Sequence, residues 1–267
     1  MRYCPDRGRR ALGITRHPQL QDRKGWTGQG AKGRRQTGKR AGSGRLELLI
    51  ARSDRPLPPH VATSLESVVL DGVPHGEWDN ALLSGTLAAD FDEPLLLSQA
   101  RLERANLVGA SLAGSRLVDV VIDGCDLSGT DFERTALSRV EVRNSKLAGV
   151  QFAQSRWHDV RFIDCQLDGA NIRFVRGEFV RFERCRMRQA ELRDSVLTAV
   201  AWWDCDLTDA DVSNIKIVRA QLHGSNIAGM VGATSFVPIA LDAQQAPAFA
   251  EHFMATLGIV VGDRVQD

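Results

Sequence analysis

Residues 98–130 read SQARL ERANL VGASL AGSRL VDVVI DGCDL SGT, and every complete group of five ends on a large apolar residue. The column formed by every fifth residue runs from Leu102 to Ile227, and 25 of its 26 members are apolar. Gly177 is the exception. Only 43% of the chain is hydrophobic, so chance does not explain this column.

A second column lies two residues before the first and is made mostly of small residues, as at Ala100, Ala105 and Ser115. The α-helix repeats every 3.6 residues and the β-strand every two, so neither has a period of five. A chain that turns a corner every five residues, with both columns inward, closes a four-sided coil of about 20 residues. We therefore predict an all-β solenoid, a right-handed quadrilateral parallel β-helix, over residues 98–230. Its six to seven coils would stack about 4.8 Å apart.

The repeat resembles the pentapeptide-repeat protein family, whose motif is A(D/N)LXX. Two literal copies are Ala105-Asn106-Leu107 and Cys125-Asp126-Leu127, and two more begin at Cys205 and Ala210. The resemblance, to the actinobacterial type with a C-terminal helix, implies a β-helix whose open end that helix covers. It also implies that the helix can form a homodimer. Some family members are similar to B-DNA in width and charge, bind DNA gyrase and protect it from quinolones.

Composition divides the chain into four segments. Residues 1–56 form a Gly-rich arm with 15 Lys or Arg against 4 Asp or Glu, and they lack an apolar face, so we predict disorder. The arm is interpreted as a solvated tail, as a nucleic-acid-binding tail, or as sequence that precedes the native start, for instance at Val61. No signal peptide or membrane-spanning run is apparent, which predicts a cytoplasmic protein without membrane contact.

The other three segments follow from the repeat. Residues 57–97 are acidic and lack Lys and Arg, and we expect them to form an irregular first coil that caps the solenoid. Residues 98–230 are the β-helix. In residues 231–267 we expect an extended stretch at 235–241, a helix that Asp242 can cap and that runs to Leu257, and a last strand at 259–261. Pro247 lies inside the early turns of this helix, so the alternative is that the regular helix begins there. This segment would cap the other end.

Gly177 is the one place where the period is interrupted. Phe174 and Phe179 occupy outward positions beside it, while the inward position lacks a side chain. A void in the core is costly, so we expect a bulge that turns Phe179 inward. The alternative is that both rings are exposed.

The residue pattern argues against catalysis. A solid four-sided rod offers no concave pocket, and no nucleophile motif, phosphate loop or metal cluster is present. We expect no enzyme activity, no cofactor and no metal. Cys125, Cys165, Cys185 and Cys205 share one inward slot, spaced by multiples of 20, and are interpreted as packing residues because the slot needs a small side chain.

The expected function is that of a non-catalytic, rigid protein-interaction scaffold whose protein partner is unknown. The alternative is a DNA mimic that binds and protects DNA gyrase, which is less favoured because the repeats hold 18 basic and 18 acidic residues. The basic coils point instead to an acidic protein surface, although a charged band is also typical of a solvated face. The candidate partner surface consists of Asp194, Trp203, Asp204, Asp206, Asp209 and Asp211, together with Arg156, Arg176 and Arg181.

Overall fold

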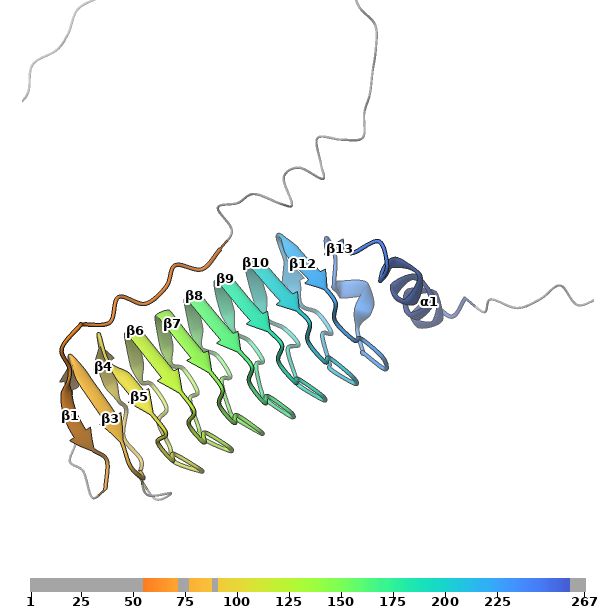
Figure 1. The fold of residues 1–267 in the computed structure, drawn as a ribbon. Coiled ribbons are helices and arrows are strands. Elements are labelled where there is room, and N and C mark those ends of the chain that lie inside the picture. Colours follow the sequence, from red (N-terminus) through yellow and green to blue (C-terminus); the bar gives the residue numbers. More distant parts are fainter. Residues whose placement is uncertain (1–54, 72–76, 88–90, 260–267) are drawn as a thin grey trace, which may run out of the picture. The chain divides into compact units, whose positions relative to one another are not determined.

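A computed structural model describes residues 55–71, 77–87 and 91–259 (Figure 1). The arm, up to residue 54, lies outside the described residues, as do residues 260 and 261 of the expected last strand. None of the helices that are described is long and apolar enough to span a membrane.

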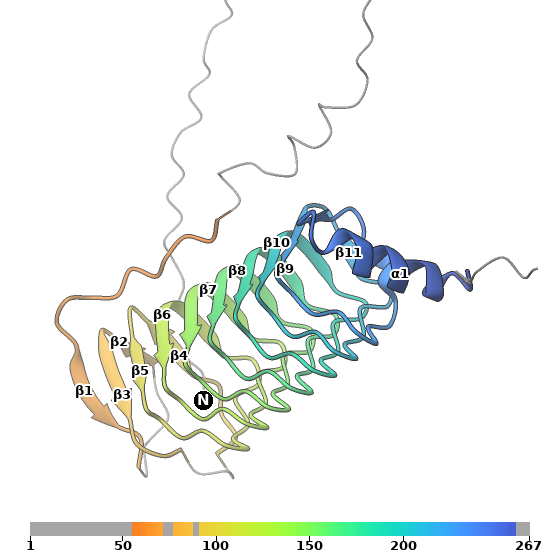
Figure 2. The same cartoon turned by 45° about the vertical axis from the view of Figure 1, so that its right-hand side comes forward.

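The described chain is a solenoid of parallel strands that form one 13-stranded sheet (Figures 1 and 2). Its central strands are β6 (Arg116–Asp123), β7 (Ala136–Arg143), β8 (Arg156–Ile163), β9 (Arg176–Glu183) and β10 (Val196–Trp203). Before them lie β1 (Glu66–Val69), β2 (Glu77–Asp79), β3 (Ala81–Ser84), β4 (Leu96–Ser98) and β5 (Arg101–Glu103). After them come β11 (Lys216–Ile217), β12 (Ala220–His223), the 3-10 helix η2 (Ala233–Ser235), β13 (Ala240–Leu241) and α1 (Ala246–Thr256).

Each repeat coil has four sides. A central strand covers two of them, because it bends at a residue in the left-handed region, such as Asp119 with a φ of 56°. Strand β6 pairs in register with β7, as Leu117 does with Leu137. The other two sides pair through single bridges, Asp126 with Lys146 and Asp131 with Gln151. The quadrilateral parallel β-helix is confirmed, and with its first coils it makes about eight turns.

Both predicted inward columns form the core. Every apolar member of the column from Leu102 to Ile227 is buried, and so is the column of small residues. The aromatic rings of the large column stack between coils. The ring centroids of Phe162 and Phe182 are 5.1 Å apart, and those of Phe182 and Trp202 are 6.0 Å apart. Burial of such side chains stabilises the fold by about 1.5–3 kcal/mol each.

Gly177 stays in register, and the expected bulge is wrong. In β9 it pairs with Trp157 on one side and Leu197 on the other. A Cβ atom at Gly177 would lie 2.8 Å from Leu197 Cδ2 and 2.9 Å from Val180 Cγ2. The neighbouring side chains therefore fill the space, and Phe179 remains outward and half-buried, edge-on to the His158 ring.

The N-terminal coils are regular in pairing but not in length. Glu66 of β1 pairs with Ala81 of β3, and Glu77 of β2 pairs with Leu96 of β4. Both turns are shorter than those of the later coils. The strands thus begin well before residue 98, and the fivefold period does not reveal them because the shorter turns break it.

At the C-terminal end, Phe236 closes the core. It is fully buried and its ring lies 4.9 Å from that of Trp202. Helix α1 begins at Ala246, one residue before Pro247, which agrees with the later of the two expected starts. Asp242 is not its cap, and the Asp242 carboxylate contacts His223 Nδ1 at 2.6 Å. No residue of α1 is buried, although Phe249 packs partly against the core.

Candidate interaction surface

Ion pairs between coils neutralise most of the basic band. Residues 139–193 contain 12 basic side chains. Ten of them lie within 4.0 Å of a carboxylate, as Arg184 does at 2.7 Å from Asp164 and Arg161 at 3.0 Å from Glu141. The other eight are Arg139, Arg143, Lys146, Arg173, Arg181, Arg186, Arg188 and Arg193. Exposed pairs of this kind contribute only about 0–1 kcal/mol each, but they cancel most of the field of the band.

Arg156 and Arg176 are the two exceptions. They are exposed, they pair directly in the register between β8 and β9, and neither has an ion-pair partner in the described part of the chain. The two residues lie on adjacent coils, whose backbones are about 4.8 Å apart. The positive charge that remains on the central coils is therefore concentrated on this side.

An aromatic ring borders the same two arginines. Phe174, on the corner before β9, is 50% exposed. Gln154, Arg156, Phe174 and Arg176 together line a surface hollow of about 440 Å³. We call these four residues the arginine patch. Arginine and aromatic side chains are enriched in protein interfaces relative to the rest of the surface.

Arg181 and Trp203, both expected on the partner surface, face each other instead. The guanidinium carbon of Arg181 lies 4.0 Å above the Trp203 ring, and its Nη1 lies 3.3 Å from Glu183. Arg181 is 8% exposed, and burial lowers its pKa. Little of Arg181 is left for a partner to contact.

The acidic residues expected on the partner surface do not form one continuous patch. Asp206 and Asp211 belong to separate bridge ladders on two sides of the coil. Asp206 binds Arg188 and the Thr208 hydroxyl. Burial opposes ionisation of Asp206, but its hydrogen bonds to Thr208 and Arg188 outweigh burial and hold its pKa below the ordinary value.

The remaining three aspartates lie at corners of the coil. Asp194 accepts a hydrogen bond from the Asn214 amide, at 3.3 Å. Asp204 and Asp209 are exposed. These three, with Asp211, are the acidic groups of this coil that stay available to solvent.

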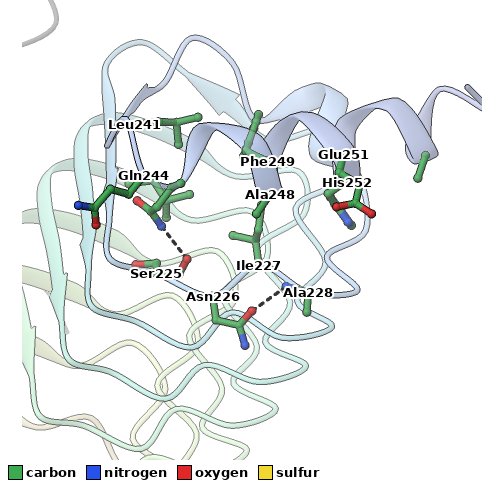
Figure 3. A pocket seen from close by; sticks show the side chains of 13 residues that line it. Ser225, Asn226, Ile227, Ala228, Leu241, Gln244, Ala248, Phe249, Glu251 and His252 are labelled. Atoms are coloured by element: carbon green, nitrogen blue, oxygen red, sulfur yellow. Dashed lines mark hydrogen bonds between the residues drawn. The ribbon is translucent and has the colours of Figure 1, made fainter. Parts of the chain in front are cut away.

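A second hollow lies between α1 and the last coil (Figure 3). It has a volume of about 540 Å³, and Ala248 of α1 lies over Ile227. Gln245 Nε2 donates to the Ser225 carbonyl at 2.7 Å, and His252 Nε2 contacts the Met230 carbonyl at 2.7 Å. These polar groups hold the helix, and the lining offers no nucleophile with a base beside it.

Metal-ligating residues do not converge in the described ranges: no group of three His, Cys, Asp or Glu there could hold an ion. Cys125, Cys165, Cys185 and Cys205 are free and buried. Burial raises the pKa of the Cys125 thiol to about 11.

Stacked four-sided coils and a solid core define the chain as a β-helical repeat protein. The family model described as "Pentapeptide repeat region" matches residues 96–172 and 155–231. The chain belongs to the pentapeptide-repeat family.

Solved structures match the chain at low sequence identity. A trypsin-treated variant of QnrB1, a plasmid-mediated fluoroquinolone resistance protein, is 18% identical, with a TM-score of 0.39 over 69% of this chain and 89% of that one. HetL, from the cyanobacterium Nostoc, is 16% identical, with a TM-score of 0.30 over 67% of this chain and 88% of that one. A comparison with curated protein sequences gave no match.

The sequence also held a signal for the charge neutralisation, in the spacing of opposite charges. Asp119 and Arg139 differ by 20 in residue number, as do Asp123 and Arg143, and Asp164 and Arg184. Residues with this spacing stack on adjacent coils, so the spacing alone indicates inter-coil ion pairs.

Proposed function

We propose that the protein is a non-catalytic scaffold that binds an acidic surface of a partner protein through the arginine patch. The observation that carries the proposal is the contrast within the basic band. Ten basic residues contact a carboxylate, whereas Arg156 and Arg176 are exposed and have none among the residues that the structure describes. Nothing on the chain's own described surface uses these two charges, so they are free for a partner.

The chemistry of the patch supports a carboxylate-bearing partner. A guanidinium group binds carboxylates through two parallel hydrogen bonds. Because β8 and β9 fix the backbone positions of Arg156 and Arg176, no backbone ordering entropy is lost there when a partner binds, and the remaining cost is that of ordering the two side chains. Phe174 supplies apolar contact area beside the charges.

A charge-reversal experiment tests the proposal. The full-length protein, immobilised, is compared with Arg156→Glu/Arg176→Glu in the capture of proteins from an extract of its source organism. The matched control is Arg104→Glu/Arg134→Glu, which changes the net charge by the same amount. Among the described residues, the carboxylate that Arg134 contacts is that of Glu133, at 3.8 Å. We expect the patch variant to lose a specific partner at least tenfold and the control to retain it. Equal capture by both variants would contradict the proposal.

The DNA-mimic function remains the alternative. It would use Asp194, Asp204, Asp209 and Asp211, which stay accessible. Asp206, bound by Arg188, weakens this surface. We also propose a cytoplasmic location and a homodimer through α1, whose half-buried Phe249 and Phe253 rings stack at 6.1 Å.

A further inference from the structure

The first described residues run along a corner of the solenoid. The Leu57 amide donates to Asp159 Oδ1 at 2.9 Å, and the His60 amide donates to Asp119 Oδ1 at 2.9 Å. Earlier residues of this segment thus lie on later coils, and the segment passes β9 to β6 before it enters β1 (Figures 1 and 2). We call residues 55–62 the strap. The corner ridge is the column Asp119, Arg139, Asp159, Phe179, Ala199 and Arg219.

The spacing of the strap matches that of the coils. Asp119 and Asp159 lie two coils apart, about 9.6 Å along the rod. Leu57 and His60 are three residues apart, which spans about 9.3 Å in the extended polyproline conformation. Pro56, Pro58 and Pro59 favour that conformation and remove competing N–H donors. The two N–H groups of Leu57 and His60 therefore fall opposite the two carboxylates.

The carboxylates that hold the strap are themselves anchored and buried. Asp119 is 8% exposed and accepts two hydrogen bonds from Arg139, at 2.6 and 2.5 Å. Asp159 is 3% exposed, with His158 Nε2 at 3.3 Å. Pro56 of the strap is also buried. Such contacts make the corner a built binding site for extended backbone.

The corner ridge continues past the described end of the strap into a cationic slot. The residues that line the slot include Arg181, Ala199, Ala201 and Arg219. Its volume of about 10 Å³ is roughly that of one oxygen-sized group. Arg181 is 8% exposed, and its Nε atom has no acceptor among the described residues. A buried donor without an acceptor is destabilising, so an acceptor in the slot would be favoured.

We propose that the corner ridge is a docking track for an extended segment with a carboxylate at its leading end, and that this chain's own residues 54–62 occupy it, with Asp54 in the slot beside Arg181. The slot lies one to two coils beyond Asp159, about 5–10 Å, which is two to three residues before Leu57. Arg55 carries the wrong charge for a cationic slot. Asp54 is the one acidic residue between Glu47 and Glu66.

The proposal is independent of the proposed function and has a mechanical consequence. Docking of Asp54 would add a contact with Arg181 of β9 to the two hydrogen bonds that already hold the strap. Leu57 and Asp159 are 102 residues apart in sequence, so the strap would also tie the first coils to the central ones.

Limited trypsin digestion of the full-length protein tests the slot. Trypsin cleaves both Arg52–Ser53 and Arg45–Leu46 of the same protein in one digestion. The ratio of the two cleavage rates therefore does not depend on the activity of the trypsin. If Asp54 is docked, we expect Arg52–Ser53 to be cleaved at least about tenfold more slowly. Arg181→Gln should bring the two rates together, whereas the control Arg176→Gln should not, and neither variant alters the cleaved sequences. Equal rates in the unmodified protein, or an unchanged ratio in Arg181→Gln, would overturn the proposal.

Hydrogen exchange provides a second readout that does not depend on Arg181. Leu57→Pro removes the N–H donor to Asp159 but keeps the extended conformation. We expect exchange of the His60 amide to rise at least about tenfold in Leu57→Pro and to stay unchanged in Pro58→Ala, where no N–H is lost. A His60 amide that already exchanges at the rate of a free peptide in the unmodified protein would contradict docking of the strap.

Discussion

At the scale of single residues, the inward position of each repeat fixes the coil. Leu147 is fully buried, while its neighbour Lys146 is exposed, with its Nζ 3.6 Å from the carboxylate of Asp126. The two side chains differ in direction because successive residues of a pleated chain alternate between faces. Their contributions to stability should therefore differ greatly.

The paired substitutions Leu147→Asp and Lys146→Ala measure this difference. An aspartate at position 147 would place an unpaired charge between Leu127 and Leu167 on the adjacent coils, and we expect a loss of at least about 3 kcal/mol. Lys146→Ala should cost no more than about 0.5 kcal/mol. Thermal and urea unfolding followed by circular dichroism would check both values. Equal melting temperatures would disprove the assignment of the two positions.

The buried thiols give a prediction that depends on pH. Burial raises the pKa of Cys125 to about 11, so at pH 8 only about 0.1% of it is thiolate, the reactive form. Four of the chain's five cysteines are buried and should resist a thiol reagent at pH 8 until denaturant is added. Rapid labelling of more than one thiol per native chain would contradict this.

The sign of the stability effect follows from the raised pKa. The folded state favours the neutral Cys125 thiol, so its contribution is complete below the unfolded value near 9 and is lost as the pH rises toward 11. Urea midpoints measured between pH 8 and 11 should fall over that window.

At the scale of elements, the coil accommodates one missing side chain by packing rather than by bulging. Strand β9 keeps its register through Gly177, because Leu197 and Val180 occupy the space that a side chain would need. Cores at native density leave little room for an added methyl group. The same strand presents Arg176 outward, so its register also sets the geometry of the arginine patch.

Gly177→Ala tests this packing. The new Cβ would meet Leu197 Cδ2 at 2.8 Å, and we expect a loss of about 1–3 kcal/mol from overpacking. Gly129→Ala serves as the comparison, since its Cβ meets no atom within 4 Å and its cost comes from a φ of 66° alone. Urea unfolding measures both. An unchanged midpoint for Gly177→Ala would mean that the core beside β9 is loosely packed.

At the scale of the whole molecule, charge is organised along the solenoid by contacts between coils. Ion pairs such as Arg184 with Asp164 cancel the basic band that the sequence suggests. Within residues 139–193, Arg156 and Arg176 are the basic residues without an ion pair among the described residues, while corner aspartates such as Asp204 and Asp209 stay exposed. Such a surface differs from the evenly negative surface of a DNA duplex.

This distribution predicts the outcome of gyrase assays. We expect that the protein, with or without residues 1–54, neither inhibits gyrase supercoiling nor rescues it from a quinolone, because Arg156 and Arg176 would repel a DNA-binding groove. Supercoiling assays at two salt concentrations measure this. A salt-sensitive rescue that Asp206→Lys abolishes would establish the DNA-mimic alternative instead.

The sequence by itself determined that each coil has four sides and about 20 residues, which columns point inward, and that four cysteines are buried. Each repeat contacts only its neighbours, so one local pattern, repeated from Leu102 to Ile227, encodes the regular coils of the β-helix but not its shorter first coils. It also placed Arg156 and Arg176 outward. It could not separate them from the other arginines of the band, because whether a charge is free depends on the neighbouring coils.

The tertiary structure alone decided the features that rest on irregular, long-range contacts. These are the burial of Arg181 against Trp203, the closure of the core by Phe236, and the strap held by Asp119 and Asp159. None of them recurs at a fixed spacing, so no sequence period records them. The contact of Leu57 with Asp159 joins residues 102 apart, and only the folded chain brings such groups together.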